Sequence, residues 1–300
     1  MVGRAELRDV SNREVVGVIA GKGGRGAVEE RSRRQEVVEE VAIAEWEEER
    51  VQEHMLELPR SQHEVITIDD EDETMEIDDF EEDAHDYATD ILRYLKSVET
   101  SPPPPALTAR VRTVLVDWLI NIRDSWELNT TTLFLSVSLL DRFLGTPEGL
   151  ATPKDSLQLA AVTAIMVACK LEESRPPRLD DFVWVTDNSY SAKAVRAMER
   201  RMVAALDWRL SPALESTFLE GYSRALALST DQQALAMATL QASLLQASMV
   251  EVFPSLAAAA ALYQHVASSS SSLHLLEEVA GWEAGVVAQV AARMGERKTT

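Results

Sequence analysis

Two segments of the chain would be apolar on every side if helical, and they constrain the fold more than any other feature. They are LQLAAVTAIMVACK (157–170) and SLAAAAALYQHV (255–266), and neither contains proline or glycine. A helix that is apolar all round has to be buried, and its alanines let neighbouring helices approach closely. We therefore expect each segment to form the central helix of its own bundle.

Amphipathic patterns, with apolar residues three and four positions apart, surround both segments. The first group of expected helices covers 107–125, 130–144, 153–173, about 179–185 and 191–206. The second group covers about 214–227, 231–249, 255–267, 272–281 and 283–294. Capping-type residues, Asn129 and Thr130, precede the helix at 130–144. With no strand-like alternation after residue 107, the sequence predicts an all-α fold of two tandem five-helix domains, 107–210 and 211–297.

The segment before these domains divides into an N-terminal helix with a proline linker (84–106) and a tail (1–83). The prolines of SPPPP (101–105) end the helix. Without a partner we expect this helix to have little to bury against, and an isolated helix of this length is marginal in water. The acidic run IDDEDETMEIDDFEED (68–83) repels itself, which predicts a disordered tail. Whether residues 27–57 form a helix is left open.

The net charge of −21 is concentrated in the tail, where 26 acidic and 10 basic residues give −16. The other 217 residues carry 24 acidic and 19 basic side chains, a balance of −5, which argues against nucleic-acid binding. The single cysteine, Cys169, fits a reducing compartment, and the longest apolar stretch (255–263) is too short to span a membrane. Nucleus and cytoplasm are the expected locations. Arg31, Arg33 and Arg34 serve either as a nuclear address or as partners of nearby glutamates.

We expect no catalytic residue, no metal site and no cofactor. The five histidines have no ligand-like spacing, and the phosphate-cradling loop and the kinase motifs are absent.

Several ordered stretches resemble the cyclin family, most of all mitotic B-type cyclins and next A-type. The stretches are RTVLVDWLINI (112–122), SLLDRFL (138–144), LQLAAVTAIMVACKLEE (157–173), PPRLDDF (176–182), VTDNSYS (185–191), MERRMVAALDWRL (198–210) and FPSLAAAAALY (253–263). The resemblance implies two tandem cyclin folds and a non-catalytic subunit that forms a heterodimer with a cyclin-dependent kinase, which it activates to control cell-cycle (G2/M, mitotic) progression. It does not settle B-type against A-type, nor which kinase or substrates are involved.

By this resemblance, a Lys–Glu pair meets the mobile αC helix of the kinase, with apolar residues around it. The implied kinase-binding residues are Lys170, Glu199, Leu171, Val203, Trp208, Leu210, Tyr87, Ile91 and Tyr94. From the residues alone, Lys170 could be an exposed lysine that complements a helix end, and Glu199 could pair with Arg196 or a nearby lysine.

Resemblance also implies a patch that docks Arg-x-Leu peptides of substrates. It would comprise Val111, Val114, Leu115, Trp118, Asn121, Leu157 and Gln158. The family often has an acid where this chain has Asn121. An acid would make a charge-assisted hydrogen bond with the peptide arginine, so we expect a weaker or altered docking preference. The alternative is that this face, Leu115 above all, is core.

The tail begins with RAELRDVSN (4–12), which resembles the destruction box read by the anaphase-promoting ubiquitin ligase. The matching residues are Arg4, Leu7, Val10 and Asn12. Lys22 is the only lysine before Lys96, which makes it the expected ubiquitin acceptor within the tail.

Two alternatives to a kinase regulator stay open: a cyclin-fold transcription-type factor, and a helical scaffold that binds no kinase. The first predicts a basic face, and the second predicts loss of Lys170 and Glu199.

Overall fold

The computed structural model describes residues 90–100, 103, 106–266 and 270–295. Within these ranges the secondary structure is helical and contains no strand. The predicted all-α fold class is therefore confirmed. The tail at 1–83 lies outside the described residues.

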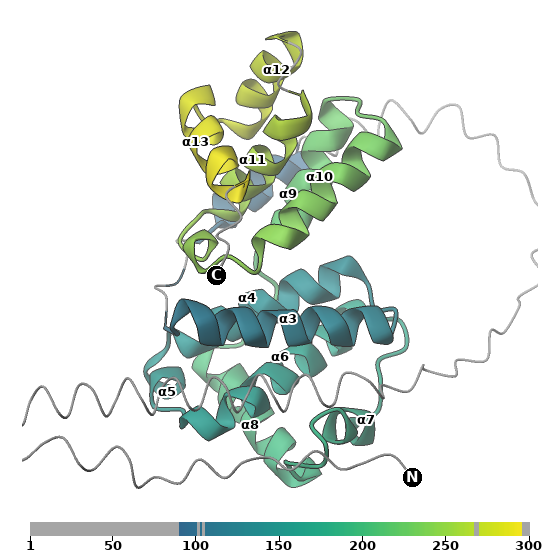
Figure 1. Cartoon of the computed structure of the whole chain (residues 1–300), viewed down its shortest axis with the longest axis vertical. Helices are drawn as coiled ribbons and strands as arrows, with labels where there is room; N and C mark the ends of the chain where they lie inside the picture. Colours follow the sequence, from purple (N-terminus) through teal and green to yellow (C-terminus); the bar gives the residue numbers. More distant parts are fainter. Residues whose placement is uncertain (1–89, 101–102, 104–105, 267–269, 296–300) are drawn as a thin grey trace, which may run out of the picture. The chain divides into compact units, whose positions relative to one another are not determined.

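Five main helices form the first bundle (Figure 1): α3 (Ala109–Ser125), α4 (Thr130–Leu144), α6 (Leu157–Glu172), α7 (Leu179–Trp184) and α8 (Ala192–Ala205). A short helix, α5 (Pro147–Leu150), and a 3-10 turn, η2 (Lys154–Ser156), link α4 to α6. Helix α6 contacts each of the other four main helices. Every residue from Leu159 to Cys169 is buried, as expected for the central helix.

The second bundle repeats this plan with α9 (Glu215–Ala225), α10 (Thr230–Ser243), α11 (Pro254–Val266), α12 (Ser270–Ala280) and α13 (Ala284–Gly295). Helix α11 contacts the other four, and its residues from Ser255 to Leu262 are all buried. The last helix, whose completeness the sequence left open, packs on α11 through buried residues that include Val287 and Val290.

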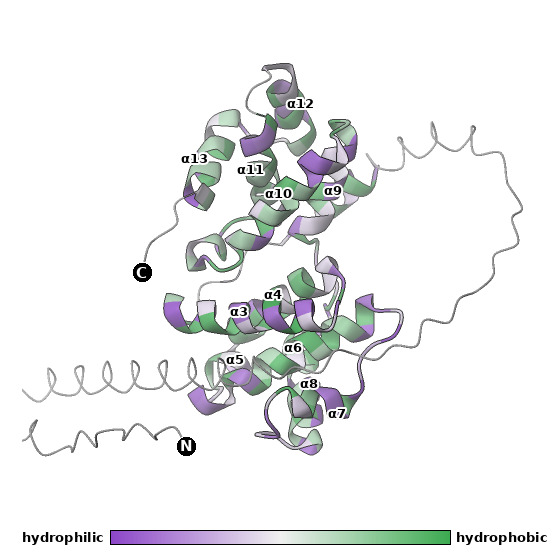
Figure 2. Cartoon of the chain, turned by 45° about the vertical axis from the view of Figure 1, so that its right-hand side comes forward, coloured by the Kyte–Doolittle hydropathy of each residue, from purple (hydrophilic) through white to green (hydrophobic). Residues whose placement is uncertain are grey.

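The outer helices have the amphipathic character that their patterns predicted. Figure 2 shows α6 mainly in the hydrophobic colour, whereas α3 alternates between hydrophilic and hydrophobic residues along its length. Helix α8 buries Val195, Met198 and Met202, which are three and four residues apart, and leaves most of its polar residues exposed. One stripe of each outer helix therefore packs on the central helix.

The third helix begins later than we expected, at Leu157 rather than Pro153. The hydroxyl of Thr146 caps the separate helix α5 by accepting a hydrogen bond from the Gly149 N–H at 3.0 Å. Gly149 packs so tightly that a Cβ on it would lie 1.9 Å from the carbonyl oxygen of Phe143. Because α5 turns back onto α4 in this way, the chain needs η2 before it can enter α6.

Helix α10 ends earlier than expected, at Ser243, and the chain continues as the 3-10 turn η3 (Ala247–Met249). The carbonyl oxygens of Leu244 and Leu245 accept hydrogen bonds from Arg112 Nη1 (2.6 Å) and Thr113 Oγ1 (2.9 Å) of α3. The helix stops because α3 supplies these carbonyls with tertiary partners.

Asn129 precedes α4 as expected, but its side chain does not cap that helix. The carboxylate of Glu173, at the end of α6, accepts hydrogen bonds from the Asn129 backbone N–H and side-chain amide, both at 2.8 Å. Glu173 also accepts a hydrogen bond from the hydroxyl of Thr132. The N-terminus of α4 is thus capped by an acid from another helix, which complements its dipole.

The N-terminal helix, described over residues 90–98, has more to bury against than we expected. It packs on the second bundle: Leu92 is buried, and a Cβ on Gly221 of α9 would lie 2.5 Å from Leu92 Cδ2. The Lys96 ammonium donates to the carbonyl oxygen of Ala280 and lies 5.1 Å from the centre of the Trp282 ring. Burial lowers the pKa of Lys96, an effect that Glu99 partly offsets. The helix therefore docks within this chain and does not need a partner in order to pack.

Candidate functional site

Lys170 and Glu199 form an ion pair at the surface of the first bundle. Lys170 lies in the last turn of α6, and Glu199 lies in the middle of α8. The two side chains are 50% and 24% exposed, so a protein partner can reach both. In the described structure Glu199 pairs with Lys170. An exposed pair adds little stability, so its location at the surface is its more informative property.

The apolar residues predicted to accompany this pair differ in exposure. Val203 is buried and Leu210 is half-buried, whereas Leu171 is exposed. Trp208 is 77% exposed, more than any other large apolar side chain among the described residues. Trp208 follows Asp207 in a turn. Both residues have left-handed backbones, with φ of +60° at Trp208 and +51° at Asp207. A non-glycine residue adopts this conformation at some cost, so a tight turn holds the indole on the outside.

A second apolar surface lies on helix 90–98. Ile91 and Tyr94 are 53% and 64% exposed, and Val98 one turn later is also exposed. These residues share the face that points away from the buried Leu92. Tyr87, the third residue predicted for this surface, lies outside the described residues.

Helix 90–98 is fixed at its far end by Glu99. The Glu99 carboxylate accepts hydrogen bonds from the backbone N–H (2.7 Å) and the hydroxyl (2.8 Å) of Ser255, in the first turn of α11. The indole N–H of Trp282 also donates to the Ser255 hydroxyl, at 3.0 Å. The exposed face of helix 90–98 is therefore held on the second bundle, whereas the Lys170–Glu199 pair belongs to the first.

The residues predicted to dock Arg-x-Leu peptides come from α3 and α6, which are in contact. Most of their apolar side chains are buried: Leu115 and Trp118 are each 2% exposed, and Val111 and Leu157 are also buried. Val114, Asn121 and Gln158 are half-buried. The amide of Asn121 donates to the carbonyl oxygen of Asp117, one turn earlier, at 2.7 Å.

The remaining predicted site residues lie outside the described residues. They are Arg4, Leu7, Val10 and Asn12 of the destruction-box-like segment, together with Lys22.

Within the described ranges no group of three or more histidine, cysteine or acidic residues is placed to hold a metal ion. Nor is any helix there long and apolar enough to cross a membrane. Cys169 is buried in α6, and this burial raises the pKa of its thiol to about 12, which suits a packing role and not a reactive one.

Sequence reasoning missed a buried ion pair between Arg112 of α3 and Asp141 of α4. Nε and Nη2 of Arg112 donate to Oδ1 and Oδ2 of Asp141 at 3.0 and 2.8 Å. A basic residue on the apolar side of an amphipathic helix was the available signal, since buried charges are nearly always paired.

Comparison with known proteins gives three results. The family described as "Cyclin, N-terminal domain" matches residues 87–211. The chain is 37% identical over 205 residues to the G2/mitotic-specific cyclin-B of Arbacia punctulata, covering 63% of this chain and 49% of that protein. It is 34% identical over 191 residues to a cyclin-A3-1 of Arabidopsis thaliana, covering 59% of this chain and 53% of the relative. The chain thus spans about half the length of these curated relatives.

A solved structure gives the same fold. The X-ray structure of a viral cyclin from herpesvirus saimiri matches with a TM-score of 0.54 at 20% identity, and the match covers 71% of this chain and 96% of that chain. The repeated five-helix plan, the family match over residues 87–211 and these relatives agree: the bundles have the cyclin fold, and this chain is similar to mitotic B-type and A-type cyclins.

Proposed function

We propose that this protein is a regulatory subunit that binds and activates a cyclin-dependent kinase in the mitotic part of the cell cycle. The observation that carries the proposal is the exposed Lys170–Glu199 pair with Leu171 and Trp208. The proposed subunit has no catalytic role of its own. A protein kinase is active only when its β3 lysine meets a glutamate on its mobile αC helix. A rigid surface that binds αC in its inward position shifts the kinase toward the active state.

The exposed apolar side chains account for the strength of such an interface. Trp208, Ile91 and Tyr94 expose large apolar or aromatic surfaces, and such residues dominate binding energy once they are desolvated. Lys170 and Glu199 supply a charged centre that fixes the register of αC. Because Trp208 sits in a turn and helix 90–98 is anchored by Leu92 and Lys96, the partner meets a largely pre-formed surface.

Kinase capture tests this proposal. Purified protein is mixed with a cyclin-dependent kinase, and bound kinase and its activity are measured. The Lys170→Ala/Glu199→Ala variant should weaken binding about tenfold or more. The control, Arg224→Ala/Glu278→Ala, removes one exposed charge of each sign from the second bundle and should behave like wild type. Recovery of kinase activity with neither wild type nor variant would refute the proposal.

We further propose that the tail carries a destruction box recognised by the anaphase-promoting ubiquitin ligase. In an extended peptide, Arg4 and Leu7 would enter separate pockets and Val10 and Asn12 would continue along the groove. Arg4→Ala/Leu7→Ala should prolong the lifetime of the protein in mitotic extract. Lys22→Arg should have a smaller effect, because lysines of the folded domains can substitute. Unchanged decay of the first variant would count against the box.

We propose that substrates dock on the patch formed by α3 and α6, with an altered preference for Arg-x-Leu peptides. The Asn121 amide is engaged with the Asp117 carbonyl and carries no charge to offer a peptide arginine. Asn121→Glu should therefore tighten binding of an Arg-x-Leu peptide in a titration, with Asn121→Gln as the uncharged control. Equal affinities for the two variants would show that the missing acid does not set the preference.

For localisation, nucleus and cytoplasm remain our proposal, since a mitotic kinase regulator acts in both. Imaging of a fluorescent fusion through the cell cycle tests it, and retention in a third compartment would contradict it.

A further inference from the structure

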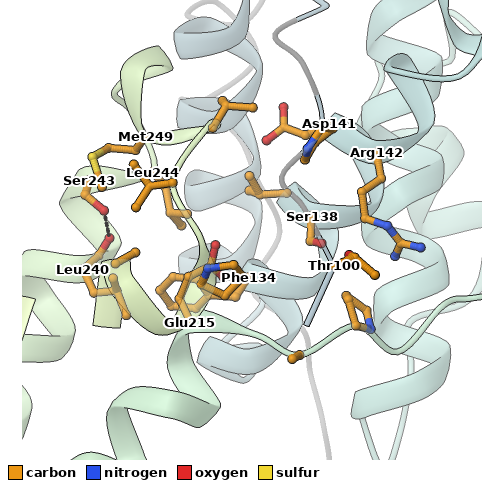
Figure 3. A pocket seen from close by; sticks show the side chains of 18 of the residues that line it. Thr100, Phe134, Ser138, Asp141, Arg142, Glu215, Leu240, Ser243, Leu244 and Met249 are labelled. Atoms are coloured by element: carbon orange, nitrogen blue, oxygen red, sulfur yellow. Dashed lines mark hydrogen bonds between the residues drawn. The ribbon is translucent and has the colours of Figure 1, made fainter. Parts of the chain in front are cut away.

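A cavity of about 80 Å³ lies where the two bundles meet (Figure 3). We call it the junction cavity. Its apolar wall includes Phe134 of α4 and Leu240 and Leu244 at the end of α10. Its charged lining consists of Arg112, Asp141, Arg142 and Glu215. Two acids and two arginines therefore border a small space between packed helices.

Arg112 connects the bundles across this cavity. Its Nε and Nη2 donors are taken by Asp141, and its Nη1 donates to the carbonyl oxygen of Leu244 at 2.6 Å. Thr113, the next residue, donates to the Leu245 carbonyl oxygen. All three nitrogens of the Arg112 guanidinium thus have acceptors, and one of these acceptors belongs to the second bundle.

Glu215 lies in the first turn of α9 and lines the same cavity. Burial above all raises the pKa of its carboxyl to about 7; the hydrogen bond from its own backbone N–H opposes this rise, and Asp141 adds to it. Arg112 lowers this pKa and Glu99 raises it, both more weakly than Asp141. Glu215 is half-buried, so water moderates these effects but does not remove them.

The charged groups that face Glu215 can be assigned element by element. Helix α3 contributes Arg112, α4 contributes Asp141 and Arg142, and the segment after helix 90–98 contributes Glu99. The Arg142 Nη2 donates to the Arg209 carbonyl oxygen at 2.6 Å. The lining residues from α10, η3 and α11 are apolar or serine. With Glu99 included, three acids face two arginines, so the charges are matched in number only while one acid is neutral.

We propose that Glu215 is a proton-dependent clasp between the two bundles, closed when its carboxyl is protonated and loosened when it ionises. An ionised Glu215 competes with Asp141 for Arg112, and this competition weakens the bond from Arg112 to Leu244. The surfaces proposed to bind the kinase are divided between the bundles, with Lys170 and Glu199 on the first and helix 90–98 on the second. Loosening the clasp should therefore lower kinase affinity, a consequence that rests on the proposed function.

The pH dependence has a definite sign. The folded pKa of Glu215, about 7, exceeds its ordinary value of 4.5, so the folded protein holds this proton more tightly than the unfolded chain. Between these two values stability falls as pH rises, and above about 7 this contribution stays constant.

Thermal unfolding of the full chain between pH 5 and 8 tests the clasp without a kinase. Glu215→Gln keeps the size of the side chain and is always neutral. Relative to this variant, wild type should lose about 2–4 °C in Tm between pH 5 and 8. The control, Glu220→Gln, lies on the same helix but does not line the cavity, and it should keep the wild-type pH dependence. Parallel Tm profiles for wild type and Glu215→Gln would overturn the proposal.

Hydrogen exchange on wild type supplies a second readout that needs no variant. After correction for intrinsic exchange rates, amides around Leu244 and Leu245 should exchange faster at pH 8 than at pH 6 relative to those of α6. Equal protection at both pH values would again overturn the clasp. Kinase affinity is then compared at the two pH values. If the Tm difference between wild type and Glu215→Gln depends on pH but no kinase binds, the proposed function is contradicted and the clasp is still supported.

Discussion

At the scale of single residues, Trp208 is the side chain whose position is hardest to explain by the stability of this chain alone. It combines 77% exposure with a left-handed backbone, and each of these is a cost to an isolated protein. Trp126 offers a contrast, since it is buried and packs edge-to-face on Phe182 with ring centres 5.3 Å apart. The two indoles therefore belong to different classes, one suited to a partner and the other to the core.

Trp208→Ala should separate binding from folding. We expect its Tm to stay close to wild type, and its kinase affinity to fall by about 2 kcal/mol, or roughly thirtyfold. Differential scanning fluorimetry and a binding titration measure the two effects. Trp126→Ala is the matched control and should lower stability by about 3–5 kcal/mol. A Trp208 variant that binds the kinase as tightly as wild type would remove the indole from the proposed interface.

At the scale of elements, two helices have their N-termini capped by glutamates from distant parts of the chain. Glu173 caps α4, and Glu99 caps α11 through Ser255. Both acids meet free backbone N–H groups at the positive end of a helix dipole. The cap on α11 also ties helix 90–98 to the bundle, so one carboxylate determines both the start of a central helix and the placement of a surface helix.

Replacing Glu99 should therefore weaken both features. Glu99→Ala leaves the Ser255 N–H without its acceptor and should cost about 1–2 kcal/mol of unfolding free energy. Glu99→Gln keeps one acceptor oxygen and should cost less. Urea denaturation followed by circular dichroism measures the series, with Glu278→Ala as the exposed control on α12. Equal stability of all three variants would mean that the cap contributes nothing measurable.

At the scale of the whole molecule, the bundles are joined by the packing of α4 on α9 and by a few polar contacts between α3 and the end of α10. Arg112 and Thr113 donate to two consecutive carbonyls, and Arg123 Nη2 donates to the Gln241 side chain at 2.5 Å. These hydrogen bonds restrict how one bundle can rotate on the other, because apolar packing alone tolerates small rotations. The Arg112–Asp141 pair is thus a determinant of how the bundles are joined.

Breaking this pair from one side should be costly. Arg112→Met leaves Asp141 nearly buried and unpaired and should lower stability by about 3–5 kcal/mol in urea denaturation. The double variant Arg112→Met/Asp141→Leu removes both charges and should recover much of that loss. A double variant no more stable than the single one would show that the bond to Leu244, and not the charge pair, carries the effect.

The sequence by itself determined the fold class and most helix bounds, because the 3.6-residue periodicity and the all-apolar segments at 157–170 and 255–266 act locally. The candidate residues Lys170 and Glu199 came from resemblance, and only the folded chain brings them together from α6 and α8. Tertiary structure alone decided where α6 begins, where α10 ends and what holds helix 90–98. Arg112 and Leu244, which meet at the end of α10, are 132 residues apart in the sequence. Glu99 and Ser255, which hold helix 90–98, are 156 residues apart. No local pattern encodes such pairs, because each polar group is satisfied by whichever partner the packing of apolar faces brings within hydrogen-bond distance.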